Sequence, residues 1–170
     1  MIALVLLLSL VALAPGPAPS AGPTELKQAP EIMLPDLDGK TVDWKRFEGK
    51  VVLLDFWATW CQPCRRSMPE MQVLHDKWGP RGFTVLGVSV DQQGPANVQK
   101  FVATRKLTYP IAIDARHDVA GRYGISALPT AYLIDGKGRI VKRWIGAPDK
   151  KDLERQLATL LPTPETVKTD

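Results

Sequence analysis

The only two cysteines of the chain, Cys61 and Cys64, are separated by two residues and follow a strongly apolar run. That run, residues 51–57, is rich in β-branched and aromatic side chains and therefore predicts a buried strand. After the motif, apolar residues recur at three- and four-residue spacing, which predicts one face of a helix: Met68, Met71, Leu74 and Trp78. The two cysteines are thus expected at a strand-to-helix turn, where unpaired N–H groups and the helix dipole stabilise a thiolate. This placement limits the fold to one with such a turn and indicates redox chemistry.

The bulk composition is that of an ordinary globular domain. The chain has 170 residues, enough for one sizeable core and short for two, with 45% apolar and 24% charged residues. The net charge of +4 is spread along the sequence, and no basic run is longer than two residues. A nucleic-acid partner is therefore not indicated.

The first fourteen residues contain no charged side chain and only one polar one, Ser9. Their length matches the apolar part of a signal peptide and falls short of the roughly 20 residues of a membrane span. No Lys or Arg precedes this run, and Pro15 follows the small residues that would be cleaved. Residues 1–14 are therefore expected to be a signal peptide or an uncleaved membrane tether, and either one predicts export to the periplasm or another extracytoplasmic space.

The expected organisation has three parts. Residues 1–23 comprise the leader or anchor and a linker with four prolines in its nine residues 15–23, residues 24–162 the folded domain, and residues 163–170 a flexible tail. The expected strands are 50–57, 82–90, 111–113, 130–135 and 139–145, and the expected helices are 63–78, 96–105, 119–123 and 150–161. This order predicts an α/β three-layer sandwich, in which a mixed central sheet of parallel strands ends in a C-terminal antiparallel hairpin and carries helices on both faces.

The position of the two cysteines predicts their separate roles. Cys61 precedes the helix, where its sulfur meets unpaired N–H groups, so a lowered pKa is expected to make it the attacking nucleophile. Cys64, one turn into the helix, is expected to be more buried and to resolve the mixed disulfide. Pro63 suits the first helical turn, since its missing N–H costs nothing there. A bridge that closes so short a loop adds little stability, which argues against a purely structural disulfide.

Two segments carry a resemblance to a known family: Asp-Phe-Trp-Ala-Thr-Trp-Cys-Gln-Pro-Cys at 55–64 and Gly-Ile-Ser-Ala-Leu-Pro-Thr at 124–130. The sequence resembles the thioredoxin superfamily and, within it, the exported TlpA/ResA-type thiol-disulfide oxidoreductases, from about residue 28 to residue 161. The resemblance implies a thioredoxin-like fold and a redox-active disulfide between Cys61 and Cys64. It implies no organic cofactor and no metal, because the electrons reside in the two cysteines.

Asp55 lies inside the apolar strand, so desolvation is expected to raise its pKa and to prepare it for proton exchange near neutral pH. The resemblance implies that Asp55 assists the deprotonation of Cys64. It also implies a cis peptide bond before Pro129, and a backbone at Leu128 that pairs with an incoming peptide. Trp60 and Pro129 are then expected to form an apolar surface on which a partner docks.

Gln62 and Pro63, which separate the cysteines, complete the expected substrate-binding set. One departure from the family stands close by. Ser67 occupies the position where many of these proteins carry Glu, and the nearest carboxylate, Glu70, lies one turn further on. We therefore expect Asp55, rather than a glutamate on the helix, to carry the proton.

The resemblance also implies partners. They are disulfide-bearing exported proteins such as apocytochrome c or copper-site proteins, and a membrane electron donor of the DsbD/CcdA type, with this chain acting as a monomer. The expected activity is that of a protein disulfide reductase; an oxidase or isomerase on the same scaffold remains open, since the sequence does not reveal the reduction potential.

Two other functional classes remain as alternatives. A thioredoxin-fold copper-binding metallochaperone would use both thiolates, but such carriers usually add a histidine ligand and a wider cysteine spacing. A peroxiredoxin-like peroxidase would carry Pro and Thr at the positions held by Leu54 and Ala58. A zinc site would need two more ligands, and the only histidines, His75 and His117, are 42 residues apart.

Overall fold

The computed structural model describes residues 26–162, so the expected leader, the linker and the tail from residue 163 lie outside the described part. None of the helices in that part is both long enough and apolar enough to cross a membrane. Its centre is a five-stranded sheet with the order β5-β4-β3-β6-β7. The strands are β3 (Val51–Trp57), β4 (Phe83–Ser89), β5 (Ile111–Ile113), β6 (Thr130–Ile134) and β7 (Ile140–Ile145).

Strand β3 is the central strand of the sheet. Every one of its seven residues is buried, as the apolar run predicts. It pairs in parallel with β4 and antiparallel with β6, and β6 and β7 form the expected C-terminal hairpin. The strands β3, β4 and β5 run parallel, so their carboxyl ends lie at one edge of the sheet. The start of β6 lies at the same edge, because β6 runs the opposite way.

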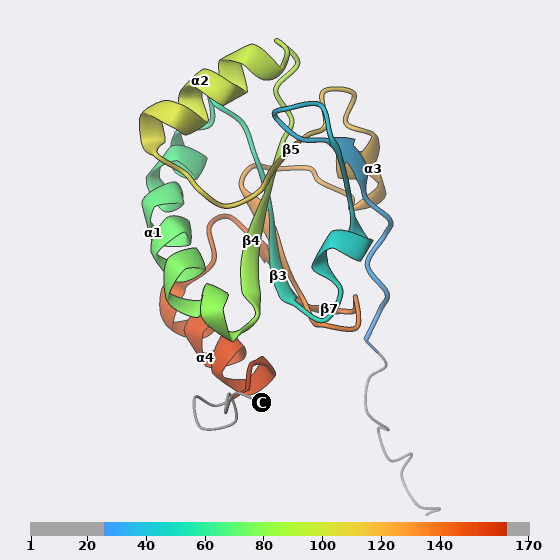
Figure 1. Cartoon of the computed structure of the whole chain (residues 1–170), viewed down its shortest axis with the longest axis vertical. Helices are drawn as coiled ribbons and strands as arrows, with labels where there is room; N and C mark the ends of the chain where they lie inside the picture. The colour runs from blue at the N-terminus through green and yellow to red at the C-terminus, as the bar shows by residue number, and fades with distance from the viewer. Residues whose placement is uncertain (1–25, 163–170) are drawn as a thin grey trace, which may run out of the picture.

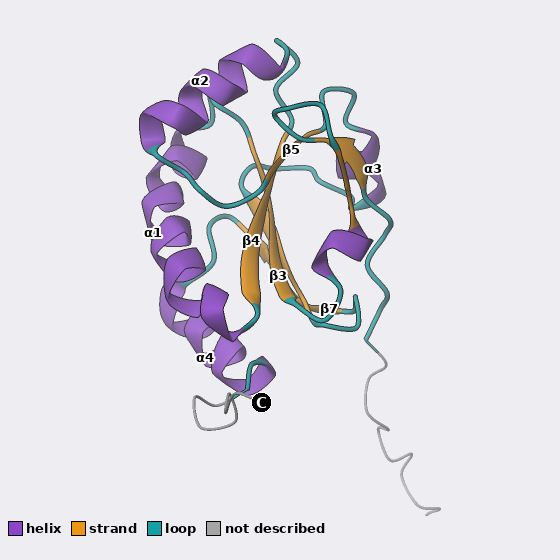
Figure 2. Cartoon of the chain, viewed as in Figure 1, coloured by secondary structure: helices purple, strands orange, loops and turns teal. Residues whose placement is uncertain are grey.

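Helices cover both faces of the sheet (Figures 1 and 2). The helices are α1 (Gln62–Trp78), α2 (Pro95–Arg105), α3 (Asp118–Arg122) and α4 (Lys150–Leu160). On one face lie α1, α2 and α4, while α3, the 3-10 helix η1 (Trp44–Phe47) and the hairpin of β1 (Met33–Pro35) and β2 (Thr41–Asp43) lie on the other. The expected three-layer α/β sandwich is confirmed.

The alternation of side chains along β3 divides the core in two. Phe56 faces α3 and packs against Tyr123 and Tyr132, with ring centroids 5.3 Å and 6.4 Å away. Trp57 faces the other side and packs against Phe101 of α2 at 5.5 Å. Each fully buried side chain of this size stabilises the fold by about 1.5–3 kcal/mol. Asp55, two residues before Trp57, shares the face that α1 and α2 cover.

Helix α4 is fixed to both of its neighbours. Lys77 of α1 and Glu154 form an ion pair of 2.6 Å, and Asp152 accepts a hydrogen bond of 3.0 Å from Trp144 Nε1 of β7. Leu153 and Leu157 are fully buried. Leu160, in the last turn of the helix, is half-buried.

Candidate active site

The turn between β3 and α1 places the two cysteines at the carboxyl edge of the sheet. Cys61 is the N-cap of α1, and Cys64 lies in its first turn with a backbone N–H that donates to Cys61 Sγ at 3.3 Å. The two sulfurs are joined in a disulfide with an S–S distance of 2.02 Å. Pro63 lies in the first helical turn, where it displaces no hydrogen bond. The helix N-terminus therefore provides an N–H donor to the sulfur of Cys61.

Both cysteines are buried in this oxidised form. Cys64 is fully buried, and Cys61 retains 5% of its accessible surface, so Cys64 is the more buried of the two, as expected. The N-cap position turns the Cys61 side chain back over the helix start, and the bridge to Cys64 holds it there. Gln62 and Pro63 between them are exposed.

The loop before β6 lies beside this turn. Phe56 of β3 pairs with Thr130 of β6, so the residues just before Thr130 lie at the same edge of the sheet as the cysteines. The Leu128–Pro129 peptide bond is cis, as expected. Within residues 26–162, the backbone N–H and C=O of Leu128 make no hydrogen bond, while Pro129 O accepts one of 2.8 Å from Gly146 N. An unpaired stretch of backbone is thus available next to the disulfide.

The exposed apolar surface at this edge differs from the expected one. Trp60 is 67% exposed, in agreement with a docking role, but Pro129 is buried and does not contribute to the surface. Its place is taken by Ile145 at the end of β7, which is also 67% exposed and pairs with Thr130. Ile145 was not identified from the sequence, because an apolar residue that ends a strand ordinarily indicates core.

Asp55 is a buried carboxylate on the face of β3 that α1 and α2 cover. It is 3% exposed, and no hydrogen bond joins its side chain to another of residues 26–162. Loss of hydration raises the pKa of Asp55 to about 7 from its ordinary 3.8. The expectation of a raised pKa is therefore confirmed, and the group can exchange a proton near neutral pH.

A second buried carboxylate, Asp91, was missed by sequence reasoning. It lies just beyond β4 and is 2% exposed. Its oxygens accept hydrogen bonds from Thr59 N at 2.9 Å, Thr59 Oγ1 at 2.6 Å and Ser89 Oγ at 2.7 Å. Because Thr59 lies two residues before Cys61, Asp91 ties the turn that carries the disulfide to the neighbouring strand. The sequence offered one signal for Asp91: together with Ser89, it places two polar residues at the end of a mostly apolar strand.

The side chains that follow Cys64 on α1 supply no further carboxylate to the thiols. Ser67 Oγ donates to the carbonyl oxygen of Cys64 at 3.0 Å. Glu70, one turn on, lies 3.8 Å from Lys150 of α4. The Arg65 guanidinium lies over the ring of Phe101, 5.9 Å from its centroid. This leaves Asp55 as the candidate proton carrier.

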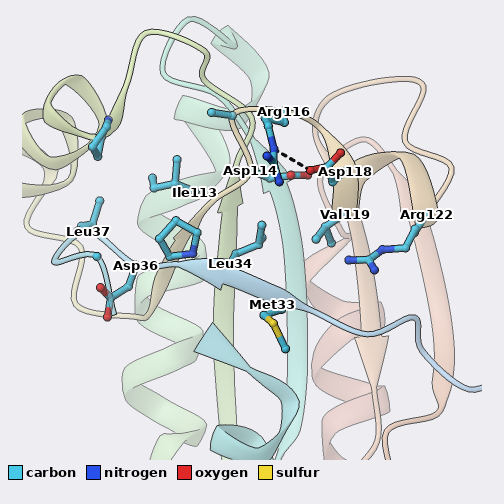
Figure 3. A pocket seen from close by; sticks show the side chains of 14 residues that line it. Met33, Leu34, Asp36, Leu37, Ile113, Asp114, Arg116, Asp118, Val119 and Arg122 are labelled. Carbon is cyan, nitrogen blue, oxygen red and sulfur yellow. Dashed lines mark hydrogen bonds and ion pairs between the residues drawn. The ribbon is translucent and has the colours of Figure 1, made fainter. Parts of the chain in front are cut away.

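A cavity of about 890 Å³ lies between the β1–β2 hairpin, the end of β5 and α3 (Figure 3). Its lining is mostly apolar, and Arg116 and Asp118 at its border form an ion pair of 2.9 Å. No cysteine or histidine lines it. Across residues 26–162, no cluster of three His, Cys, Asp or Glu side chains is arranged to hold a metal ion.

Comparison with known proteins agrees with this geometry. The model of the AhpC/TSA family matches residues 26–143. The thiol-disulfide oxidoreductase ResA of Bacillus anthracis is 39% identical over 136 residues, which cover 80% of this chain and 78% of that protein. The ResA protein of Geobacillus thermodenitrificans is 39% identical over 134 residues, 79% of this chain and 76% of that one.

Solved structures show the same likeness. A crystal structure from Chlorobium tepidum, described as a thiol:disulfide interchange protein DsbE, superposes with a TM-score of 0.75 at 34% identity and covers 79% of this chain and 96% of its own. A secreted thiol-disulfide isomerase from Corynebacterium glutamicum superposes with a TM-score of 0.72 at 27% identity, over 85% of this chain and 95% of its own. The expected resemblance to ResA-type proteins is confirmed.

Proposed function

Because this chain belongs to the AhpC/TSA family and is a thiol-disulfide oxidoreductase, we propose that it reduces disulfide bonds in exported proteins by exchange through Cys61 and Cys64. The observation that carries the proposal is the position of the disulfide. It lies at the N-terminus of α1, beside the unpaired backbone of Leu128 and the exposed ring of Trp60. A structural cross-link would need neither of these neighbours.

The first step uses the reduced protein. The Cys61 thiolate, stabilised by the start of α1, attacks one sulfur of a partner disulfide. An S–S bond forms between Cys61 and the partner, the partner's own S–S bond breaks, and its second sulfur leaves as a thiolate. The product is a mixed disulfide.

In the second step Cys64 resolves this intermediate. Asp55, ionised, accepts the proton of the Cys64 thiol, and the resulting thiolate attacks Cys61 Sγ. The bond between Cys61 and the partner breaks, and the partner's remaining sulfur leaves as a thiolate that is protonated by Asp55 or by solvent. Two electrons pass from the dithiol to the partner, and the protein ends with the Cys61–Cys64 disulfide.

The partner is proposed to bind in an extended conformation. The free N–H and C=O of Leu128 can pair with its backbone, as an added strand pairs with a sheet edge. Trp60, together with the exposed Gln62 and Pro63, would contact side chains on either side of the partner cysteine. Such backbone-led binding fits a reductase that accepts several substrates.

We place this reaction outside the cytoplasm, in the periplasm or an equivalent space. The apolar first fourteen residues support export, as does the secreted relative from Corynebacterium glutamicum. The proposed substrates are apocytochrome c or copper-site proteins with oxidised cysteines. A membrane donor of the DsbD/CcdA type would then reduce the Cys61–Cys64 disulfide after each turnover.

The reduction potential of the Cys61–Cys64 pair tests this function. We expect equilibration against glutathione and dithiothreitol buffers to give a value near that of thioredoxin, roughly −270 mV, with insulin reduction that is lost in Cys61→Ser. A potential near that of DsbA, roughly −120 mV, would make the protein an oxidant and contradict the proposal.

A further inference from the structure

Two buried donors near Asp55 have no acceptor. The Tyr109 hydroxyl and the Trp57 indole Nε1 are both enclosed, on residues that are 3% and 0% exposed, and neither has a hydrogen-bond partner within residues 26–162. A buried donor left unpaired costs about 1–3 kcal/mol. The Asp55 carboxylate, on the same face of β3 as Trp57, is a candidate acceptor for both donors.

Gly87 shows how closely both donors pack against β4. Gly87 of β4 pairs with Asp55 of β3 in parallel register, so its missing side chain would lie on the same face as the Asp55 carboxylate. A Cβ atom built on Gly87 would lie 2.9 Å from Trp57 Nε1, 2.8 Å from Ile111 Cδ1 and 3.3 Å from Tyr109 Cε2. The absence of a side chain at Gly87 thus allows Trp57, Ile111 and Tyr109 to pack closely against β4, on the face that carries Asp55.

We propose that the Tyr109 hydroxyl and the Trp57 Nε1–H donate hydrogen bonds, through a bridging water, to the ionised form of Asp55. Tyr109 and Gly87 are then positioning residues for the transfer of the Cys64 proton. This inference rests on the role proposed above for Asp55. The Asp55 charge contributes, after burial, to raising the pKa of Tyr109, which agrees with a short separation between the two groups.

The elements that pack against Asp55 bring few other ionisable groups that could change its pKa. Helix α1 brings Cys64 and His75 to this face, and the His75 ring lies 6.0 Å from the Tyr109 ring. The opposing strand residues are Gly87 of β4 and Ala131 of β6, which do not titrate.

The charged side chains of the covering helices are engaged elsewhere. Arg65 of α1 and Arg105 of α2 lie over Phe101, and Glu154 and Lys150 of α4 pair with Lys77 and Glu70 on α1. The pKa of Asp55 is set by burial, with no charged neighbour contributing.

The direction of the expected change in the pKa of Asp55 depends on whether the donors bind its ionised or its protonated form. A hydrogen bond to the carboxylate stabilises the ionised form and lowers its pKa, so removal of a donor raises the pKa further. Less Asp55 is then ionised at neutral pH, and proton transfer from Cys64 slows. At a pH below the pKa of Asp55, the turnover rate of the variant falls tenfold for each unit by which the pKa has risen. At a pH well above it, the rates of the variant and the unaltered protein converge. A merely structural defect would lower the rate at every pH.

The test uses Tyr109→Phe in the oxidised protein, where no thiol titrates. We expect the ¹³C resonance of the Asp55 carboxyl to titrate about one pH unit higher than in the unaltered protein, which corresponds to the lower range for a hydrogen bond to a charged group. The matched control is Tyr123→Phe. It removes the same atom on the opposite face, where the hydroxyl donates to Pro30 O at 2.8 Å, and should leave the Asp55 titration unchanged.

An Asp55 pKa that is unchanged or lower in Tyr109→Phe overturns the inference. If that variant does not fold by near-ultraviolet circular dichroism, Gly87→Ala replaces it, because the added methyl group would displace the Trp57 Nε1–H and the Tyr109 ring and should also raise the pKa of Asp55. Turnover provides the second readout: we expect about a tenfold loss at pH 6 that disappears at pH 9. If Asp55→Asn has no effect on turnover at any pH, the proposed function of Asp55 fails, whereas the carboxyl titration still decides the hydrogen bonds.

Discussion

Two buried carboxylates lie close to the cysteine turn. They are about equally buried, but they differ in the number of hydrogen bonds that they accept. Asp55 is 3% exposed and Asp91 is 2% exposed. Asp91 accepts three hydrogen bonds from Thr59 and Ser89, whereas Asp55 has no protein donor within the described chain. Burial alone therefore does not decide what a carboxylate does in this fold. The number of donors around it does.

The difference separates a structural role from a chemical one. A carboxylate that accepts three hydrogen bonds, such as Asp91, holds Thr59, and hence the turn before Cys61, in place. A poorly bonded one such as Asp55 is less stable as an anion, so it binds and releases a proton near neutral pH. The same residue type can fix the geometry of the site or move its proton, and the following substitutions test that division.

The largest effect is expected from Asp55→Asn. Burial raises the pKa of Asp55 from 3.8 to about 7, so the folded protein binds more protons than the unfolded chain between these values. The free energy of unfolding then falls as pH rises from about 4 to 7, and the ionised group costs on the order of 4 kcal/mol above that range. Asp55→Asn removes this cost. Urea unfolding of the oxidised protein should show a gain of up to about 4 kcal/mol at pH 8 and almost none at pH 4.

The same variant should lose activity. Asparagine cannot accept the Cys64 proton, so insulin reduction at pH 7 is expected to fall by about 10²- to 10⁴-fold, the usual contribution of a general base. Greater stability together with lower activity would distinguish a functional carboxylate from a structural one. If Asp55→Asn and the unaltered protein are equally stable at pH 8, the ionised Asp55 carboxylate does not destabilise the fold, and the proposed contrast with Asp91 is wrong.

The opposite sign is expected for Asp91→Asn. The substitution conserves shape but replaces one acceptor oxygen with a donor that faces Thr59 or Ser89. A lost hydrogen bond to a charged group, with its partner left buried, corresponds to about 1.5–3 kcal/mol. We therefore expect the free energy of unfolding at pH 7 to fall by about that amount in urea titrations. A gain, as predicted for Asp55→Asn, would show that Asp91 is not a structural anchor.

The sequence was sufficient for much of this arrangement. The apolar run at 51–57 and the three- and four-residue spacing after Cys64 predicted β3 and α1 to within a residue. Asp55 was identified because a carboxylate inside an apolar strand is conspicuous. Asp91 and Tyr109 were missed, since their importance depends on Thr59 and Gly87, which reach them only through strand pairing and loop contacts. Similarly, Pro129 was expected at the surface, whereas it is buried just before β6, where its carbonyl oxygen accepts a hydrogen bond from Gly146 N.

A smaller effect is expected when one donor to Asp91 is removed. Thr59→Val retains the branched shape but loses the hydroxyl that donates at 2.6 Å, while Thr59 N still donates at 2.9 Å. We expect a loss of about 1–2 kcal/mol in unfolding free energy and no change in the pH profile of turnover. Thr59→Ser, which keeps the hydroxyl, is the matched control and should lose less. If both variants lose the same stability, the methyl group rather than the hydrogen bond is responsible.

The smallest effect on stability is expected at Trp60, which lies next to Thr59 but belongs to neither carboxylate's surroundings. With 67% of its surface exposed, Trp60→Ala should change the free energy of unfolding by no more than about 0.5 kcal/mol. If its ring contacts bound partners, KM for a peptide disulfide should rise while kcat changes little, because contacts made equally in the bound and transition states affect KM alone. Steady-state kinetics with a synthetic peptide disulfide measures both.

Met33→Ala provides the control for exposed apolar surface. Met33 is 73% exposed on β1, beside the large cavity and away from the cysteine turn, so its truncation should alter neither stability nor KM. A rise in KM for Trp60→Ala alone would place partner binding at the edge of the sheet that carries Cys61. It would also show that this short turn separates its tasks by residue: Thr59 is bound inward to Asp91, Trp60 faces the partner, and Cys61 carries the electrons. A comparable rise for both variants would instead indicate that any exposed apolar side chain binds the peptide.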